Sequence, residues 1–109
     1  MRFVLRLMSL VSLTGLSCGI VSGQTDLLEK SVRTILDTKC VVCHGQTRMS
    51  DLDLRESKTA LAGGKRGPSI VPGNPEVSLL FKAVKGEGEL QMPPGKTALT
   101  PQEIAVVHD

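Results

Sequence analysis

Five consecutive residues, Cys40-Val41-Val42-Cys43-His44, carry the side chains with the clearest chemical potential in this chain. A Cys-x-x-Cys-His run is typical of sites where haem is attached covalently. The two thiols are spaced to add across the two vinyl groups of one porphyrin. The histidine that follows can present an imidazole nitrogen to the iron from the proximal side. The run therefore predicts one haem c attached through Cys40 and Cys43, with His44 as an axial ligand.

The same cysteines could instead belong to a zinc site or to a redox-active or structural thiol pair. A tetrahedral zinc site needs a second pair of ligands, but outside the run the sequence offers only Cys18 and His108. A thioredoxin-type pair expects a βαβ surrounding, and no such pattern is present. Haem is favoured because it also explains the histidine after the second cysteine, and a haem-free zinc or redox-thiol protein is kept as an alternative.

Met92 is the candidate for the sixth position on the iron, because it precedes Pro93 and Pro94. A residue before proline is pushed toward extended geometry, so this stiff segment can hold a thioether out toward a metal. Met49 competes, but it lies only five residues from His44 and is not expected to reach the far face of the haem. We predict that His44 and Met92 form the axial pair, which raises the reduction potential relative to harder ligands.

The other ring nitrogen of an axial histidine usually donates its proton to a fixed acceptor. Residues 65–73 form a loop punctuated by glycine and proline with an apolar centre, and a carbonyl on such a loop suits this role. We predict that the backbone carbonyl of Pro68 is the acceptor. Four basic side chains are candidates to pair with the haem propionates: Arg48, Arg55, Lys65 and Arg66.

Hydrophobic periodicity places helices around these loops. Asp26 and Glu29 are spaced as a capping box, and the apolar stripe that follows predicts a helix from Asp26 into the attachment run. Further helices are predicted at residues 57–61, from Pro75 to Gly86, and from a second capping box at Thr100. The expected fold is all-α, with long loops rich in glycine and proline.

The amino terminus has the layout of a secretory signal peptide. Arg2 and Arg6 accompany an apolar run that ends in small residues, and its interruptions by serine, threonine and glycine make it a poor membrane span. We predict a signal peptide over residues 1–23, a single domain over residues 24–109 and export to the periplasm. Membrane attachment is expected only if Cys18 is lipidated.

The charge and the aromatic content of the chain limit the range of possible functions further. The chain carries 13 basic and 11 acidic residues, and removal of Arg2 and Arg6 with the leader leaves eleven of each. No basic stripe remains for nucleic acid. Phe81 is the only aromatic residue outside the leader. Because aromatic rings normally supply much of the buried area of a small core, a porphyrin could fill that role.

From Ile35 to Val107 the sequence resembles the planctomycete-type cytochrome c modules. The matching stretches include Cys40-Val41-Val42-Cys43-His44-Gly45, Ala60-Leu61-Ala62-Gly63-Gly64, Gly67-Pro68-Ser69-Ile70-Val71-Pro72-Gly73 and Met92-Pro93-Pro94. The resemblance implies a small class I cytochrome c-like helical domain wrapped around one covalent haem. It also implies attachment at Cys40 and Cys43 and an axial pair of His44 and Met92. The last helix of the family would continue beyond Asp109, so we expect this chain to be the first part of a larger protein.

The expected function is an exported single-haem electron-transfer module whose redox partners the sequence does not specify. No acid/base dyad or activated nucleophile is evident, which favours an electron carrier over an enzyme. A five-coordinate haem sensor or a peroxidase-like module is the alternative that would follow if Met92 were not bound to iron.

Overall fold

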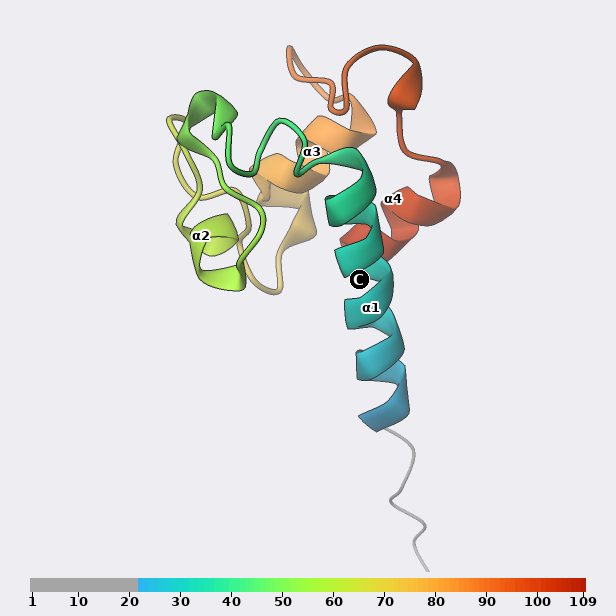
Figure 1. Cartoon of the computed structure of the whole chain (residues 1–109). Helices are drawn as coiled ribbons and strands as arrows, with labels where there is room; N and C mark the ends of the chain where they lie inside the picture. The colour runs from blue at the N-terminus through green and yellow to red at the C-terminus, as the bar shows by residue number, and fades with distance from the viewer. Residues whose placement is uncertain (1–21) are drawn as a thin grey trace, which may run out of the picture.

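The computed structural model describes residues 22–109, which form four α-helices joined by long loops (Figure 1). The helices are α1 (Ser22–Lys39), α2 (Ser57–Ala62), α3 (Leu79–Lys85) and α4 (Pro101–His108). Within this range there is no strand, only an isolated bridge between Gly64 and Gly67. The predicted all-α class is confirmed. The predicted leader and Cys18 lie outside the described residues, except that Ser22 and Gly23 open α1.

Helix α1 begins at Ser22 and not at Asp26 as predicted. No proline separates residues 22–25 from the predicted start, so the helical backbone extends by one more turn toward the amino terminus. The predicted apolar stripe is confirmed, because Ile35 and Leu36 are buried and Val32 packs against the core.

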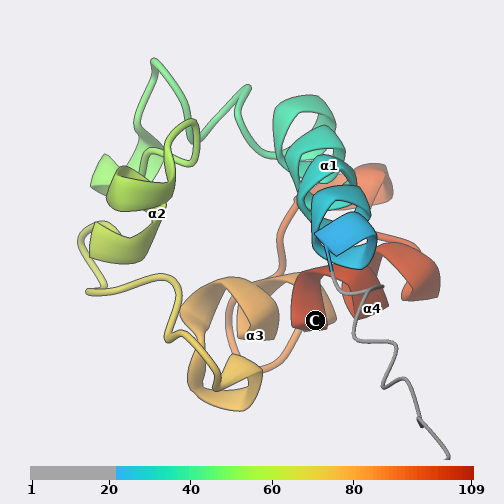
Figure 2. The ribbon, with the colours of Figure 1, turned by 90° about the horizontal axis from the view of Figure 1, so that it is seen from below.

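The core consists of two apolar clusters that meet at α1. The first cluster contains Ile35, Phe81, Val84 and Leu99, with Ile104, Val106 and Val107 packed against it. The second contains Leu36, Leu54 and Ala60, with partly buried residues that include Cys40 and Leu80. Helix α4 lies against α1 and α3, whereas α2 lies on the other side of the molecule (Figure 2). The end of α1 is therefore held from both sides.

The helix predicted from Pro75 to Gly86 is interrupted at Ser78. A 3₁₀ turn spans Pro75–Val77, Ser78 is extended with φ −71° and ψ 124°, and α3 begins at Leu79. The buried Ser78 hydroxyl accepts the N–H of Val71 at 2.9 Å and lies 3.0 Å from the carbonyl oxygen of Asn74. Serine hydroxyls that bind nearby backbone in this way compete with helix formation, which explains the break. Gly86, in the left-handed region, ends α3 as predicted.

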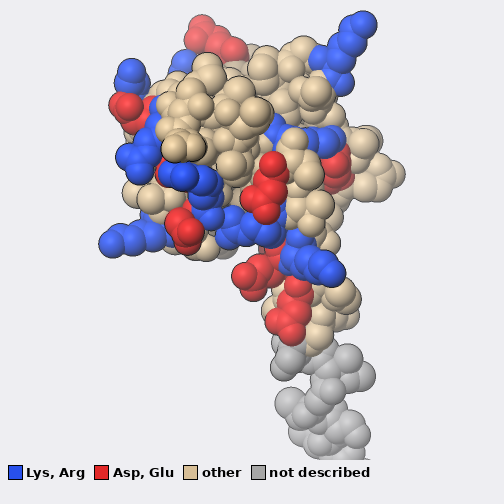
Figure 3. Space-filling view, viewed as in Figure 1, with Lys and Arg blue, Asp and Glu red and all other residues tan. Residues whose placement is uncertain are grey.

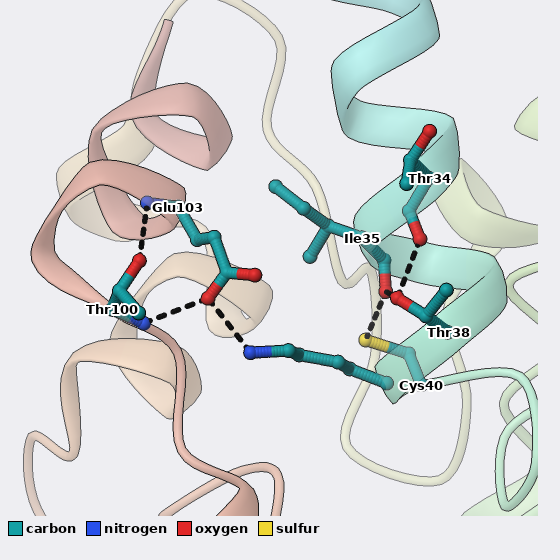
Figure 4. Close-up of polar contacts among 7 residues, drawn as sticks. Thr34, Ile35, Thr38, Cys40, Thr100 and Glu103 are labelled. Atoms are coloured by element: carbon teal, nitrogen blue, oxygen red, sulfur yellow. Dashed lines mark hydrogen bonds and ion pairs between the residues drawn. The ribbon is translucent and has the colours of Figure 1, made fainter.

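The capping box predicted for the last helix is confirmed. The Thr100 hydroxyl accepts the N–H of Glu103 at 3.2 Å, and the Glu103 carboxylate accepts the N–H of Thr100 at 2.8 Å. The same carboxylate oxygen accepts a hydrogen bond from Lys39 Nζ at 2.7 Å (Figure 4). Hydrogen bonds from Lys39 and from the Thr100 backbone hold the pKa of Glu103 below its usual value. The cap of α4 thus also joins α4 to the last residue of α1.

None of the helices in the described part of the chain is long and apolar enough to cross a membrane.

We predict that Thr100→Ala lowers the free energy of unfolding by about 1 kcal/mol, the usual cost of removing a threonine N-cap. The substitution removes the acceptor for Glu103 N–H and loosens the carboxylate that binds Lys39. Thr97→Ala is the matched control, because Thr97 is exposed and its hydroxyl only donates to the carbonyl of Pro94. Urea unfolding of the full chain measures both. Equal losses in the two variants would contradict a capping role for Thr100.

Candidate functional site

A largely apolar cavity opens between the end of α1, the loops on either side of α2, and α3. Its empty volume is about 1030 Å³, part of which is open to solvent. The apolar lining residues are Leu52, Leu54, Leu79, Leu80, Ala83, Val84, Leu90, Pro93 and Pro94. The sulfur- and nitrogen-bearing side chains along the same walls are Cys40, Cys43, His44, Met49 and Met92. Segments far apart in the sequence therefore bring four of the five predicted site residues to one cavity.

The attachment run follows directly from the end of α1 and turns tightly. The N–H of His44 donates to the carbonyl of Cys40 at 2.9 Å, and that of Cys43 donates to the same oxygen at 3.2 Å. Cys40 and Cys43 are free, half-buried thiols. Burial raises the pKa of Cys40, an effect that the Lys39 ammonium partly offsets. Cys40 is therefore a neutral thiol whose sulfur lies 4.0 Å from the carbonyl oxygen of Ile35 (Figure 4).

Metal-binding side chains do not otherwise gather in the described range. Between residues 22 and 109, no three His, Cys, Asp or Glu side chains are grouped as a metal site would require. His108, the histidine outside the attachment run, is exposed on α4, and its ring packs against Phe81 in a T-shaped arrangement with the two centroids 5.3 Å apart. It does not line the cavity.

The His44 ring is oriented by a backbone carbonyl, but not by the predicted one. Nδ1 of His44 lies 2.9 Å from the carbonyl oxygen of Met49, so Nδ1–H is the donor and Nε2 keeps its lone pair. In this structure the acceptor is the carbonyl of Met49 and not that of Pro68, which the sequence analysis predicted. The reason is a local reversal of the chain, in which the N–H of Met49 donates to the carbonyl of Cys43 at 3.0 Å. Pro68 is exposed, although its neighbours Gly67 and Ser69 line the cavity.

Met92 is half-buried on a loop tied back to α3, since its N–H donates to the carbonyl of Ala83 at 2.9 Å. Met49 also lines the cavity, but it comes from the turn after His44 and its side chain is mostly in solvent, with 52% of the residue exposed. Both methionines that the sequence singled out are thus near the cavity, and they approach it from different segments.

Asp53 is a site neighbour that the sequence reasoning missed. It is buried between Leu52 and Leu54 and accepts two hydrogen bonds from the Arg55 guanidinium, at 3.0 Å and 2.7 Å. Arg48 Nε lies 3.5 Å from the same carboxylate. These contacts, those of Arg55 foremost, hold the pKa of Asp53 far below its usual value. An acid placed between two leucines and two positions before an arginine was the available signal.

The four basic residues proposed as propionate partners fall into two pairs, one bound to Asp53 and one lining the cavity. Arg48 and Arg55 are paired with Asp53, whereas Lys65 and Arg66 line the cavity and form no ion pair within residues 22–109. On the face drawn in Figure 3, basic and acidic side chains are intermixed.

The cavity fits a haem c by the chemistry of its donors. Two free thiols stand beside a histidine with a free Nε2, a thioether is present on another segment, and the intervening wall is apolar. An all-helical domain with such a site suits a c-type cytochrome. The family described as Planctomycete cytochrome C matches residues 40–96, more than half of the chain, and the chain belongs to that family. No curated protein and no solved structure matches the chain.

We predict that Asp53→Asn lowers the free energy of unfolding at neutral pH and makes it depend less on pH in the acidic range. Because the folded-state pKa of Asp53 is depressed, its contribution is present above the unfolded value of about 3.9 and is lost as pH falls toward the folded value. Asp51→Asn is the matched control, since Asp51 is exposed, has no ion pair in the described range and, like asparagine, tolerates the left-handed region at φ 59°. Urea midpoints at pH 7 and pH 3 measure the effect. A pH dependence that Asp53→Asn leaves unchanged would rule the contribution out.

Proposed function

We propose that this chain is an exported, single-haem electron-transfer cytochrome. In this proposal one haem c is held by thioether bonds to Cys40 and Cys43, with His44 and Met92 as the axial ligands. The observation that carries it is the convergence of these four side chains on one apolar cavity. The family to which the chain belongs supports haem c as the cofactor.

Each of these residues has a distinct role in the proposal. The haem, when bound, supplies the cycling between Fe(II) and Fe(III) on which electron transfer depends. Nε2 of His44 is available as a ligand because Met49 accepts the proton of Nδ1. Met92 offers a neutral sulfur, which favours Fe(II) and raises the potential. The apolar wall limits the access of water, which tunes the potential further.

Lys65 and Arg66 are the proposed partners of the haem propionates. Both residues line the cavity and neither is engaged by a carboxylate within residues 22–109. Charge-assisted hydrogen bonds between such cations and carboxylates are stronger than neutral ones. Arg48 and Arg55 are less suited, because Asp53 already binds them.

Export is supported by the leader-like pattern of residues 1–23, with its basic start, apolar middle and small residues at the end. Attachment of c-type haem in bacteria takes place outside the inner membrane, so export and haem attachment are parts of one proposal. Membrane anchoring would follow only from lipidation of Cys18.

A five-coordinate sensor or peroxidase-like module is the second candidate. It is favoured by the position of Met92, which is only half-buried on a loop between Gly86 and α4 in which many side chains are exposed. If this loop released Met92, the iron would have an open position for small ligands. Gas binding separates the two functions.

We predict that the full chain, produced in cells able to attach c-type haem, has the added mass of one haem and keeps it after denaturation. The double variant Cys40→Ala/Cys43→Ala should lose covalent haem completely, because both thioether bonds are removed. Val42→Ala is the control within the same run, since Val42 is 76% exposed, and it should keep the full haem mass. Mass spectrometry and haem staining on a denaturing gel give the result. A wild-type chain without covalent haem would leave only the zinc or redox-thiol alternatives.

We predict that the haem-loaded wild type is low-spin in both oxidation states and does not bind carbon monoxide, whereas Met92→Ala binds it readily and has a lower reduction potential. The physical reason is the loss of the neutral sulfur from the sixth position. Met49→Ala is the matched control and should keep the low-spin spectrum. Absorption spectra recorded with and without carbon monoxide show which of the proteins bind the gas. Rapid binding by the wild type would support the sensor, and a response to Met49→Ala alone would reverse the ligand assignment.

A further inference from the structure

The carbonyl that orients His44 belongs to a turn with an unusual backbone. Arg48, Ser50 and Asp51 have φ values of 48°, 57° and 59°, in the left-handed region that side-chain-bearing residues rarely adopt. The Met49 carbonyl in this turn accepts the Nδ1 proton of His44 at 2.9 Å and the N–H of Leu52 at 3.3 Å. Strained turns of this kind persist only where the surrounding structure holds them.

The surrounding structure here is the turn at residues 64–67. Gly64 and Gly67 exchange backbone hydrogen bonds of 3.2 Å and 3.0 Å, and the N–H of Lys65 donates to the carbonyl of Ser50 at 2.8 Å. The 64–67 turn is therefore hydrogen-bonded directly to the residue that follows Met49.

Close approach of the two turns depends on the missing side chain of Gly64. A Cβ at this position would collide with the carbonyl oxygen of Ser50 and would lie 3.0 Å from the N atom of Leu52. Both obstacles are backbone atoms, so they cannot rotate away as a flexible side chain would. The φ of Gly64 lies outside the left-handed region, which means that glycine is required here for space and not for backbone conformation.

We propose that Gly64 is a positioning residue for the axial histidine. Without a side chain, it lets the 64–67 turn close on Ser50 and so holds the Met49 carbonyl against Nδ1–H of His44. This inference rests on the proposed role of His44 as an iron ligand. A hydrogen bond from Nδ1–H makes the imidazole a stronger donor to iron, so the contact stabilises Fe(III) and lowers the reduction potential.

The test is Gly64→Ala in the haem-loaded full chain. Alanine can adopt the backbone of residue 64, so the substitution adds only the steric conflict with Ser50. We expect the Nδ1 proton of His44, observed by NMR of the ferric protein, to exchange with solvent roughly tenfold faster, the effect of losing one typical hydrogen bond. The reduction potential should rise at the same time.

Leu99→Ala is the control for general destabilisation. Leu99 is buried in the cluster with Ile35 and Phe81, and it does not line the cavity. This variant should unfold at lower denaturant concentration but keep the wild-type potential and the wild-type Nδ1–H chemical shift. A Gly64→Ala variant that keeps both wild-type values would overturn the inference.

A measurement on the wild type keeps the inference testable even if Gly64→Ala does not fold. One opening of the two turns would free both Nδ1–H of His44 and the amide of Lys65, so these two protons should show the same protection from exchange. Unequal protection would disprove the coupling between the two turns. Mass spectrometry of the same sample shows whether haem is covalently bound. If it is, unequal protection counts against the positioning role of Gly64 and not against the proposed function.

Discussion

The placement of the site depends on how α1 is held at its carboxyl end. Ile35 and Leu36 are adjacent, and successive residues of a helix point roughly 100° apart, so they enter two different clusters. One cluster fixes α1 against α3 and α4, and the other fixes it against Leu54 and Ala60. Because the chain turns only at Cys40, both contacts determine where the thiols and His44 meet the cavity.

Polar interactions around the cavity connect its parts without filling it. The Lys39 ammonium binds the Glu103 carboxylate, which also caps α4, so the end of α1, directly before the attachment run, is joined to the last helix. Asp53 engages two arginines, of which Arg48 directly precedes Met49 in the same turn. The cavity lining is largely apolar and includes the basic residues Lys39, Lys65 and Arg66, which suits an apolar plate with two carboxylates at its edge.

The scarcity of aromatic residues has a structural counterpart. Phe81 is buried in the first cluster, and the Lys85 ammonium lies over its ring in a cation–π contact, with Nζ 5.0 Å from the ring centroid. The second cluster has no aromatic ring, and its aliphatic residues Leu54 and Leu80 also line the cavity. In the proposed holoprotein the porphyrin would supply the large apolar surface that aromatic side chains supply in other small domains.

Features governed by nearest neighbours were determined by the sequence alone: the attachment run, the capping box at Thr100, the end of α3 at Gly86 and the all-α class. Each follows from residue types a few positions apart. Tertiary structure decided the break at Ser78, the burial of Asp53 and the choice of Met49 over Pro68 beside His44. These outcomes depend on which backbone atoms approach from segments that are distant in sequence or reversed by an irregular turn, and residue periodicity carries no information about such approaches.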